Sequence, residues 1–164
     1  AAGPGTAIAA ATLSVLSGWA TAVIATDLIA GWWRTDRLFC VAIGFLTTAI
    51  LHANNVRDRE VDRQHRKRTL ANLLPRWFAN LEYQALVLLP WLLVVWLILR
   101  NPATWPITVS ALVLPKAMRL ARTFPAADTP LELNPYVRRS AGLHMQFGLL
   151  ISAGYLAATL IGSI

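Results

Sequence analysis

Three side chains able to bind a divalent cation follow one another at four-residue spacing, directly after an apolar run. They are Asn54, Asp58 and Asp62. If the preceding helix continues through them, this spacing stacks the two carboxylates on one face, with Asn54 one turn earlier. Mg²⁺ prefers hard oxygen ligands and commonly combines one or two carboxylates with substrate phosphates. The spacing therefore predicts a face that can hold Mg²⁺.

Basic side chains surround this face and extend its chemistry to phosphate. The cations in question are Arg57, Arg63, Arg66, Lys67 and Arg68. Arginine and lysine form strong charge-assisted hydrogen bonds with phosphate oxygens, so the segment is suited to a diphosphate at a membrane surface. The alternative is a cytoplasmic loop whose acids serve only as i,i+4 partners of its bases. The charge pattern alone does not separate these two interpretations.

The composition indicates an integral membrane protein. Hydrophobic residues make up 56% of the chain, charged residues 14%, and the mean hydropathy is +0.51. These values lie far from those of ordinary soluble domains. The net charge is +7, but seven of the 15 Lys and Arg residues lie between Arg57 and Arg76. Topology and anionic ligands explain this clustering better than a nucleic-acid partner does.

Five segments are candidates for membrane spans, which need about 20 mostly apolar residues. They cover residues 6–30, 38–53, 83–99, 105–120 and 141–164. We therefore expect an all-α polytopic protein that forms a single membrane domain over residues 1–164. The polar segment 54–82 is expected as a loop between the second and third spans. Short connections elsewhere predict antiparallel helical hairpins.

The distribution of basic residues predicts the orientation of the chain. Ten Lys and Arg residues flank the spans on the side of the 54–82 loop, and three lie on the other side. Because basic residues accumulate in cytoplasmic loops, we expect this loop in the cytoplasm and the C-terminus across the membrane. The expected location is the cytoplasmic membrane of a prokaryote.

Several polar residues fall within or near the predicted spans. His144 and Gln146 lie early in the last span, where they could form hydrogen bonds between helices. Lys116 lies near the cytoplasmic end of the fourth span. Its ammonium group could reach a diphosphate or simply extend to the membrane interface.

The polar segment also resembles a known motif. The run Asn54-Asn55-Val56-Arg57-Asp58, followed by Asp62-Arg63 and then by Lys67, Thr69 and Leu70, resembles the second aspartate-rich motif of the UbiA superfamily of intramembrane prenyltransferases. The most similar branch is the 1,4-dihydroxy-2-naphthoate prenyltransferases of menaquinone and phylloquinone synthesis. Their motif reads approximately NNxRDxxxDxxxGKxTL. The resemblance covers the chain as the C-terminal half of such an enzyme, a UbiA-like half bundle.

This resemblance implies Mg²⁺-dependent transfer of an isoprenyl group from its diphosphate to an aromatic, naphthoate-like acceptor. By analogy, Asp58 and Asp62 would hold Mg²⁺, supported by Asn54 or Asn55. The expected diphosphate ligands are Arg57, Arg63, Lys67 and Lys116. The isoprenoid tail would run between apolar helices. Metal and cations would stabilise the leaving diphosphate by electrostatics, without a protein nucleophile.

The chain differs from the family pattern at particular positions. Arg66 stands where the motif has glycine, and Leu73 and Pro75 stand where the family has an arginine and a glycine. A glycine can serve a close backbone approach or a positive-φ turn. The family's first aspartate-rich motif, of the NDxxDxxxD kind, does not occur in these 164 residues.

Three interpretations follow. The chain could be the C-terminal half of a prenyltransferase, not expected to be active without its N-terminal half. It could instead be a non-catalytic structural subunit of a larger membrane complex, in contact with quinone, pigment or lipid. In the third interpretation, the basic loop only docks anionic lipid or a soluble partner.

Overall fold

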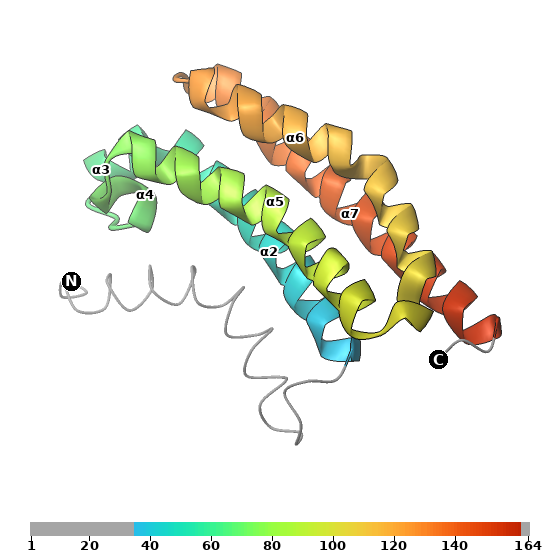
Figure 1. Cartoon of the computed structure of the whole chain (residues 1–164). Coiled ribbons are helices and arrows are strands. Elements are labelled where there is room, and N and C mark those ends of the chain that lie inside the picture. Colours follow the sequence, from blue (N-terminus) through green and yellow to red (C-terminus); the bar gives the residue numbers. More distant parts are fainter. Residues whose placement is uncertain (1–34, 162–164) are drawn as a thin grey trace.

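A computed structural model describes residues 35–161, and this part of the chain is all-helical (Figure 1). The first predicted span, 6–30, lies outside the described residues. The elements in chain order are α2 (Thr35–Arg57), α3 (Arg59–Gln64), α4 (Leu70–Leu73), α5 (Arg76–Arg100), η1 (Pro102–Val113), α6 (Leu114–Thr123), η2 (Phe124–Ala126) and α7 (Pro130–Leu160). The 3₁₀ segments η1 and η2 flank α6 without a break.

Four long segments pack side by side in a ring. Helix α2 packs against α5 and α7, and the η1–α6 segment completes the ring between α5 and α7. A single residue, Asn101, separates α5 from η1, so these two elements form the antiparallel hairpin that the short connection predicts. The interior is filled by large side chains such as Tyr83, Leu143 and Phe147, none of them solvent-accessible.

The outer faces of this ring are apolar as well. The side chains of Leu99, Leu112 and Leu160 are each more than 70% exposed. In the part of the chain that the structure describes, three helices are long and apolar enough to cross a membrane: Phe39–Arg57, Arg76–Arg100 and Pro130–Leu160. Leucine on both the inner and outer faces suits a bilayer, where packing rather than burial from water holds helices together.

The helices extend beyond the predicted spans. Helix α5 begins at Arg76 and α7 at Pro130, before the span starts predicted at residues 83 and 141. A capping box begins α7: Thr129 Oγ1 accepts from the backbone N–H of Glu132, and the Glu132 carboxylate accepts from that of Thr129. Such caps begin helices within polar sequence. Hydropathy marks only the apolar part of each helix. The fourth predicted span, 105–120, is divided between η1 and α6.

Gly154 allows α7 to approach η1 closely. A Cβ atom built at this position would lie 2.7 Å from Ile107 Cα and 2.7 Å from the Pro106 carbonyl oxygen. Small residues of this kind let the backbones of membrane helices come into contact.

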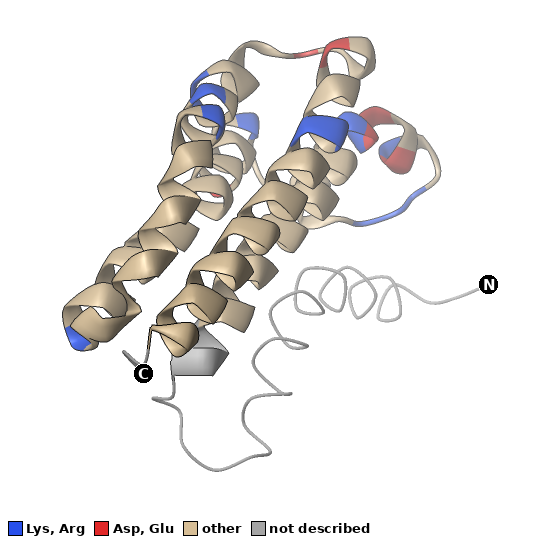
Figure 2. Cartoon of the chain, turned by 90° about the vertical axis from the view of Figure 1, so that its right-hand side faces the viewer, with Lys and Arg blue, Asp and Glu red and all other residues tan. Residues whose placement is uncertain are grey.

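Charged residues gather at one end of the ring (Figure 2). This polar end contains α3, α4, the start of α5, the end of α6 and the start of α7. Arg100, the last residue of α5, lies at the opposite end. The uneven distribution of charge along the sequence thus corresponds to a polar end and an apolar end of the bundle.

Candidate metal and diphosphate site

Asn54, Asp58 and Asp62 lie on successive helical turns, as their spacing predicts. The backbone N–H of Asp58 donates to the Asn54 carbonyl at 2.9 Å, and that of Asp62 donates to the Asp58 carbonyl at 2.8 Å. The i→i−4 pattern therefore continues across the junction between α2 and α3. This continuity places the two carboxylates one turn apart at the polar end of the bundle.

Asp58 is the centre of a hydrogen-bond network. Arg57 Nε donates to Asp58 Oδ1 at 2.7 Å, and Arg57 Nη2 donates to Oδ2 at 2.9 Å. Asn54 Nδ2 adds a bond to the same Oδ2 at 3.1 Å. The hydrogen bonds from Arg57 hold the pKa of Asp58 below its ordinary value, and the charges of Arg57 and Lys67 act in the same direction. Asp58 is therefore a carboxylate at neutral pH.

Arg57 also connects this network to the last helix. Its Nη1 donates to Asn134 Oδ1 at 3.2 Å, although 77 residues separate the two in sequence. The sequence analysis assigned no role to Asn134. Its signal in the sequence is a polar residue that precedes the last predicted span, on the side expected in the cytoplasm.

Asp62 and Lys67 form a second pair within the motif. Asp62 is only 8% exposed, and Lys67 Nζ lies 3.3 Å from each of its carboxylate oxygens. The end of α3 brings the two together, because the Lys67 N–H donates to the Asp62 carbonyl and the Arg66 N–H to the Arg63 carbonyl. This is the hydrogen-bond pattern of a Schellman motif. It folds Lys67 back over the carboxylate.

Arg66 takes the left-handed conformation that this motif requires, with φ 55°. The family motif has glycine at this place, and a Schellman motif most often has glycine there too. The substitution by arginine therefore keeps the turn and places a side chain in a strained conformation. Of the other two differences, Leu73 is the last residue of α4, and Pro75 directly precedes α5.

Two further side chains hold the motif segment against the start of α5. Arg59 Nη2 donates to the Leu74 carbonyl at 2.9 Å. Burial lowers the pKa of Arg59, although an arginine stays protonated at neutral pH. The buried His52 ring places Nε2 2.8 Å from the Ala79 carbonyl oxygen. These contacts position the α2–α3 junction and are not themselves aimed at the carboxylates.

The remaining predicted ligands lie apart from the two pairs. Arg63 lies 3.7 Å from Glu60 in an exposed ion pair. Asn55 is half-buried and makes no side-chain hydrogen bond within the described residues. Lys116 lies on α6 and donates to Gln146 Oε1 at 2.9 Å, so it belongs to a different group of residues. The predicted interhelical bonds of Gln146 and His144 are both present, because His144 Nε2 lies 3.2 Å from Thr47 Oγ1.

The donor set fits a Mg²⁺ ion that substrate phosphates would complete. Asp62 Oδ2 is buried and accepts no hydrogen bond from the described residues, and the nearby Lys67 ammonium group is its ion-pair partner. Among the side chains of residues 39–161 there is no group of three His, Cys, Asp or Glu able to hold a metal without further ligands. Two carboxylates with amide oxygens nearby are a typical partial set for Mg²⁺, which keeps waters and phosphate oxygens in its shell.

Comparison with known proteins supports the family resemblance of the motif. The family model described as "UbiA prenyltransferase family" matches residues 3–135. The chain is 36% identical over 124 residues to UbiA prenyltransferase domain-containing protein 1 of Xenopus tropicalis, covering 76% of this chain and 34% of that protein. The human protein of the same name is 33% identical over 121 residues, covering 74% of this chain and 34% of that protein.

The branch expected from the motif is less similar. The 1,4-dihydroxy-2-naphthoate octaprenyltransferase of Bacillus subtilis is 28% identical over 135 residues, covering 79% of this chain and 43% of that enzyme. The match to the two vertebrate relatives spans about a third of their length. No solved structure matches the chain.

Proposed function

Because the chain belongs to the UbiA prenyltransferase family, we propose that it forms the C-terminal half of a Mg²⁺-dependent prenyltransferase. The reaction moves an isoprenyl group from its diphosphate to an aromatic, naphthoate-like acceptor. The observation that carries this proposal is the arrangement at the α2–α3 junction. Two carboxylates one turn apart are each paired with a cation, Asp58 with Arg57 and Asp62 with Lys67.

The pairing assigns roles to these residues. Asp58 and Asp62 hold Mg²⁺, with Asn54 or Asn55 adding an amide oxygen, and Arg57, Arg63 and Lys67 bind the diphosphate. Bound Mg²⁺ stabilises the charge that develops on the leaving diphosphate. In the state described here, Arg57 and Lys67 neutralise the two carboxylates. Lys67 can turn to a phosphate oxygen through side-chain rotation, because its side chain is 60% exposed. Arg57 is 26% exposed and would exchange its hydrogen bonds to Asp58 and Asn134 for phosphate oxygens.

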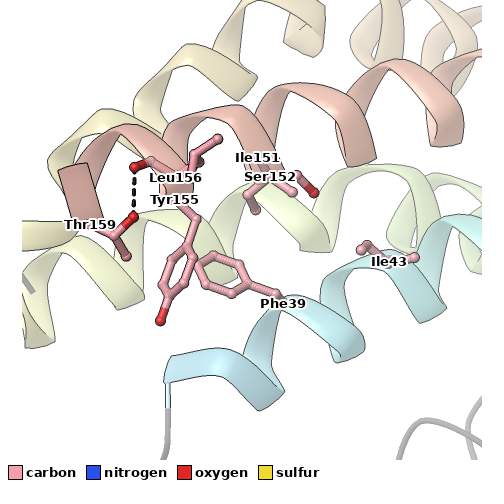
Figure 3. A pocket seen from close by; sticks show the side chains of 7 residues that line it. All are labelled: Phe39, Ile43, Ile151, Ser152, Tyr155, Leu156 and Thr159. Atoms are coloured by element: carbon pink, nitrogen blue, oxygen red, sulfur yellow. Dashed lines mark hydrogen bonds between the residues drawn. The ribbon is translucent and has the colours of Figure 1, made fainter.

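An apolar pocket between α2 and α7 supports the lipid part of the proposal. It has a volume of about 390 Å³ and is lined by Phe39, Ile43, Ile151, Ser152, Tyr155, Leu156 and Thr159 (Figure 3). The rings of Phe39 and Tyr155 contact each other edge to face in this pocket, with their centroids 5.0 Å apart. Helix α2 ends directly before Asp58 and α7 carries Asn134 near its start, so the pocket and the motif lie toward opposite ends of the same two helices. In this proposal the pocket receives the distal part of the isoprenoid tail, and the motif binds its diphosphate.

The proposed placement of the protein follows from the polar end of the bundle. We assign the motif segment to the cytoplasmic side of a prokaryotic cytoplasmic membrane, with the C-terminus across it. Isoprenyl diphosphates are water-soluble at the headgroup, so a cytoplasmic motif meets them at the interface.

A second candidate is a non-catalytic structural subunit of a larger membrane complex. One observation favours it: arginine occupies the glycine position of the second motif. In that role the paired carboxylates would only cap the α2–α3 junction.

Binding of farnesyl diphosphate to the full-length protein separates the candidates. We expect affinity that depends on Mg²⁺, disappears with EDTA, and falls at least about ten-fold in Asp58→Asn and Asp62→Asn, because each change removes a charged ligand. Glu60→Gln is the matched control, since this exposed carboxylate lies between the two and binds neither cation of the pairs. Binding that is unaffected by the two aspartate substitutions would overturn the metal assignment. Absence of any Mg²⁺-dependent binding would favour the structural subunit.

A further inference from the structure

A second group of cations lies between α6 and α7, apart from the motif. It surrounds a pocket of about 230 Å³ that is lined by Lys116, Arg119, Leu120, Thr123 and Arg139. Three of the five lining residues are basic, and Thr123 adds a hydroxyl group. Leu120 is buried against the bundle and closes the pocket on the inner side. We call this feature the α6–α7 basic pocket.

The neighbouring residues hold Lys116 in place. Its Nζ donates to Gln146 Oε1 at 2.9 Å. A Cβ atom at Gly142 would lie 3.2 Å from this Nζ, so the glycine leaves the space that the ammonium group occupies. The ammonium group therefore lies between α6 and α7, hydrogen-bonded to the side chain of Gln146.

Among the side chains that the structure describes, none compensates the charge of the α6–α7 basic pocket. Within residues 39–161, no carboxylate lies within ion-pair distance of Lys116, Arg119 or Arg139. The Arg139 guanidinium lies instead over the Tyr136 ring, 6.0 Å from its centroid. In the motif, by contrast, Arg57 and Lys67 each have an aspartate partner. Three neighbouring cations without an acid attract an anion.

The surroundings of the pocket indicate which anion it takes. The pocket lies at the polar end of the bundle, and exposed apolar side chains continue along the same two segments toward the opposite end. Leu112 is 73% exposed and lies about one turn before Lys116, while Met145 and Leu149 on α7 are 62% and 65% exposed. A free phosphate would contact only the cations. A phospholipid would use both surfaces, with its phosphate among the cations and its acyl chains along the leucines and methionine.

We propose that the α6–α7 basic pocket binds the headgroup of an anionic phospholipid. Basic pockets between membrane helices on the cytoplasmic side are suited to such headgroups. This assignment does not rest on the proposed prenyl transfer. It gives Lys116 a lipid ligand in place of the diphosphate predicted from the sequence.

The test is a titration of phosphatidylglycerol into the full-length, delipidated protein in detergent, followed by native mass spectrometry. Phosphatidylcholine with the same acyl chains is the reference lipid. We expect phosphatidylglycerol to bind preferentially, and Arg119→Gln combined with Arg139→Gln to weaken it at least about ten-fold. Lysine at both positions should keep the preference, because it keeps the charge.

The matched control is Arg122→Gln combined with Arg138→Gln. It removes the same charge from the same two helices, but neither residue lines the pocket. We expect a change of less than about two-fold. Equal losses in both double variants would show a diffuse surface charge and overturn the proposal. No preference over phosphatidylcholine, or full displacement of the lipid by millimolar inorganic diphosphate, would also overturn it, the latter in favour of a free-anion site.

Discussion

The spacing of the motif residues predicted their order along the helix. It did not predict which cation pairs with which carboxylate. The four-residue spacing of Asn54, Asp58 and Asp62 gave their order on successive turns, since an i,i+4 relation depends only on the helix continuing. The partner of each charge depends on side-chain rotation and on distant residues. Sequence alone therefore could not show that Arg57 turns to Asp58 and to Asn134 on another helix.

The structure gives a physical consequence for one difference from the family motif, the arginine at position 66 in place of glycine. Its φ of 55° is a left-handed conformation, which costs a non-glycine residue about 1 kcal/mol because Cβ crowds the next carbonyl. The Schellman hydrogen bonds and the Asp62–Lys67 pair hold the chain in this conformation. Glycine can adopt it without that strain.

We therefore expect Arg66→Gly to raise the free energy of unfolding by about 0.5–1 kcal/mol, the relief of strain being partly offset by the greater freedom of glycine in the unfolded chain. The measurement is thermal or denaturant unfolding in detergent, with Arg68→Gly as control. Residue 68 is also exposed and outside a helix, but its φ is not positive. If Arg68→Gly stabilises as much as Arg66→Gly does, the effect is loss of charge and the strain argument is wrong.

Helices and their packing were predictable to different degrees. Hydropathy located the apolar parts of α2, α5 and α7, because a span needs a long apolar run and these three helices have one. It missed the first turns of α5 and α7, the latter begun by a capping box. It also treated residues 105–120 as one span, whereas the first part of this stretch belongs to the 3₁₀ segment η1, which packs against α7.

The contact between α7 and η1 depends on Gly154. We expect Gly154→Ala to lower the free energy of unfolding by about 1–3 kcal/mol, because the new methyl group would overlap backbone atoms that cannot rotate away. Gly148→Ala is the control on the same helix, since nothing lies within 4 Å of a Cβ atom there. That change should be neutral or stabilising by up to about 1 kcal/mol. Equal destabilisation by both substitutions, measured by thermal unfolding in detergent, would contradict the packing argument.

At the scale of the whole molecule, the bundle has a polar and an apolar end. The count of basic residues along the sequence anticipated this division, because charges flanking spans must lie where the spans end. What it could not anticipate is that the polar end carries two separate basic surfaces. One is neutralised by Asp58 and Asp62 at the α2–α3 junction. The other opens between α6 and α7, where no carboxylate of the described residues pairs with it.

The same asymmetry predicts how the protein sits in the membrane. Basic residues resist transfer across the bilayer, so the end that carries α3, α4 and the α6–α7 basic pocket should remain in the cytoplasm.

Two single-cysteine variants test this orientation, Arg68→Cys at the polar end and Asn101→Cys at the opposite end. Both also carry Cys40→Ser, which removes the native cysteine. Spheroplasts treated with a membrane-impermeant maleimide should label the cysteine at position 101 directly. They should label the one at position 68 only after permeabilisation. The reverse pattern would place the motif outside the cell and separate it from isoprenyl diphosphates made in the cytoplasm, which would remove the basis of the proposed function.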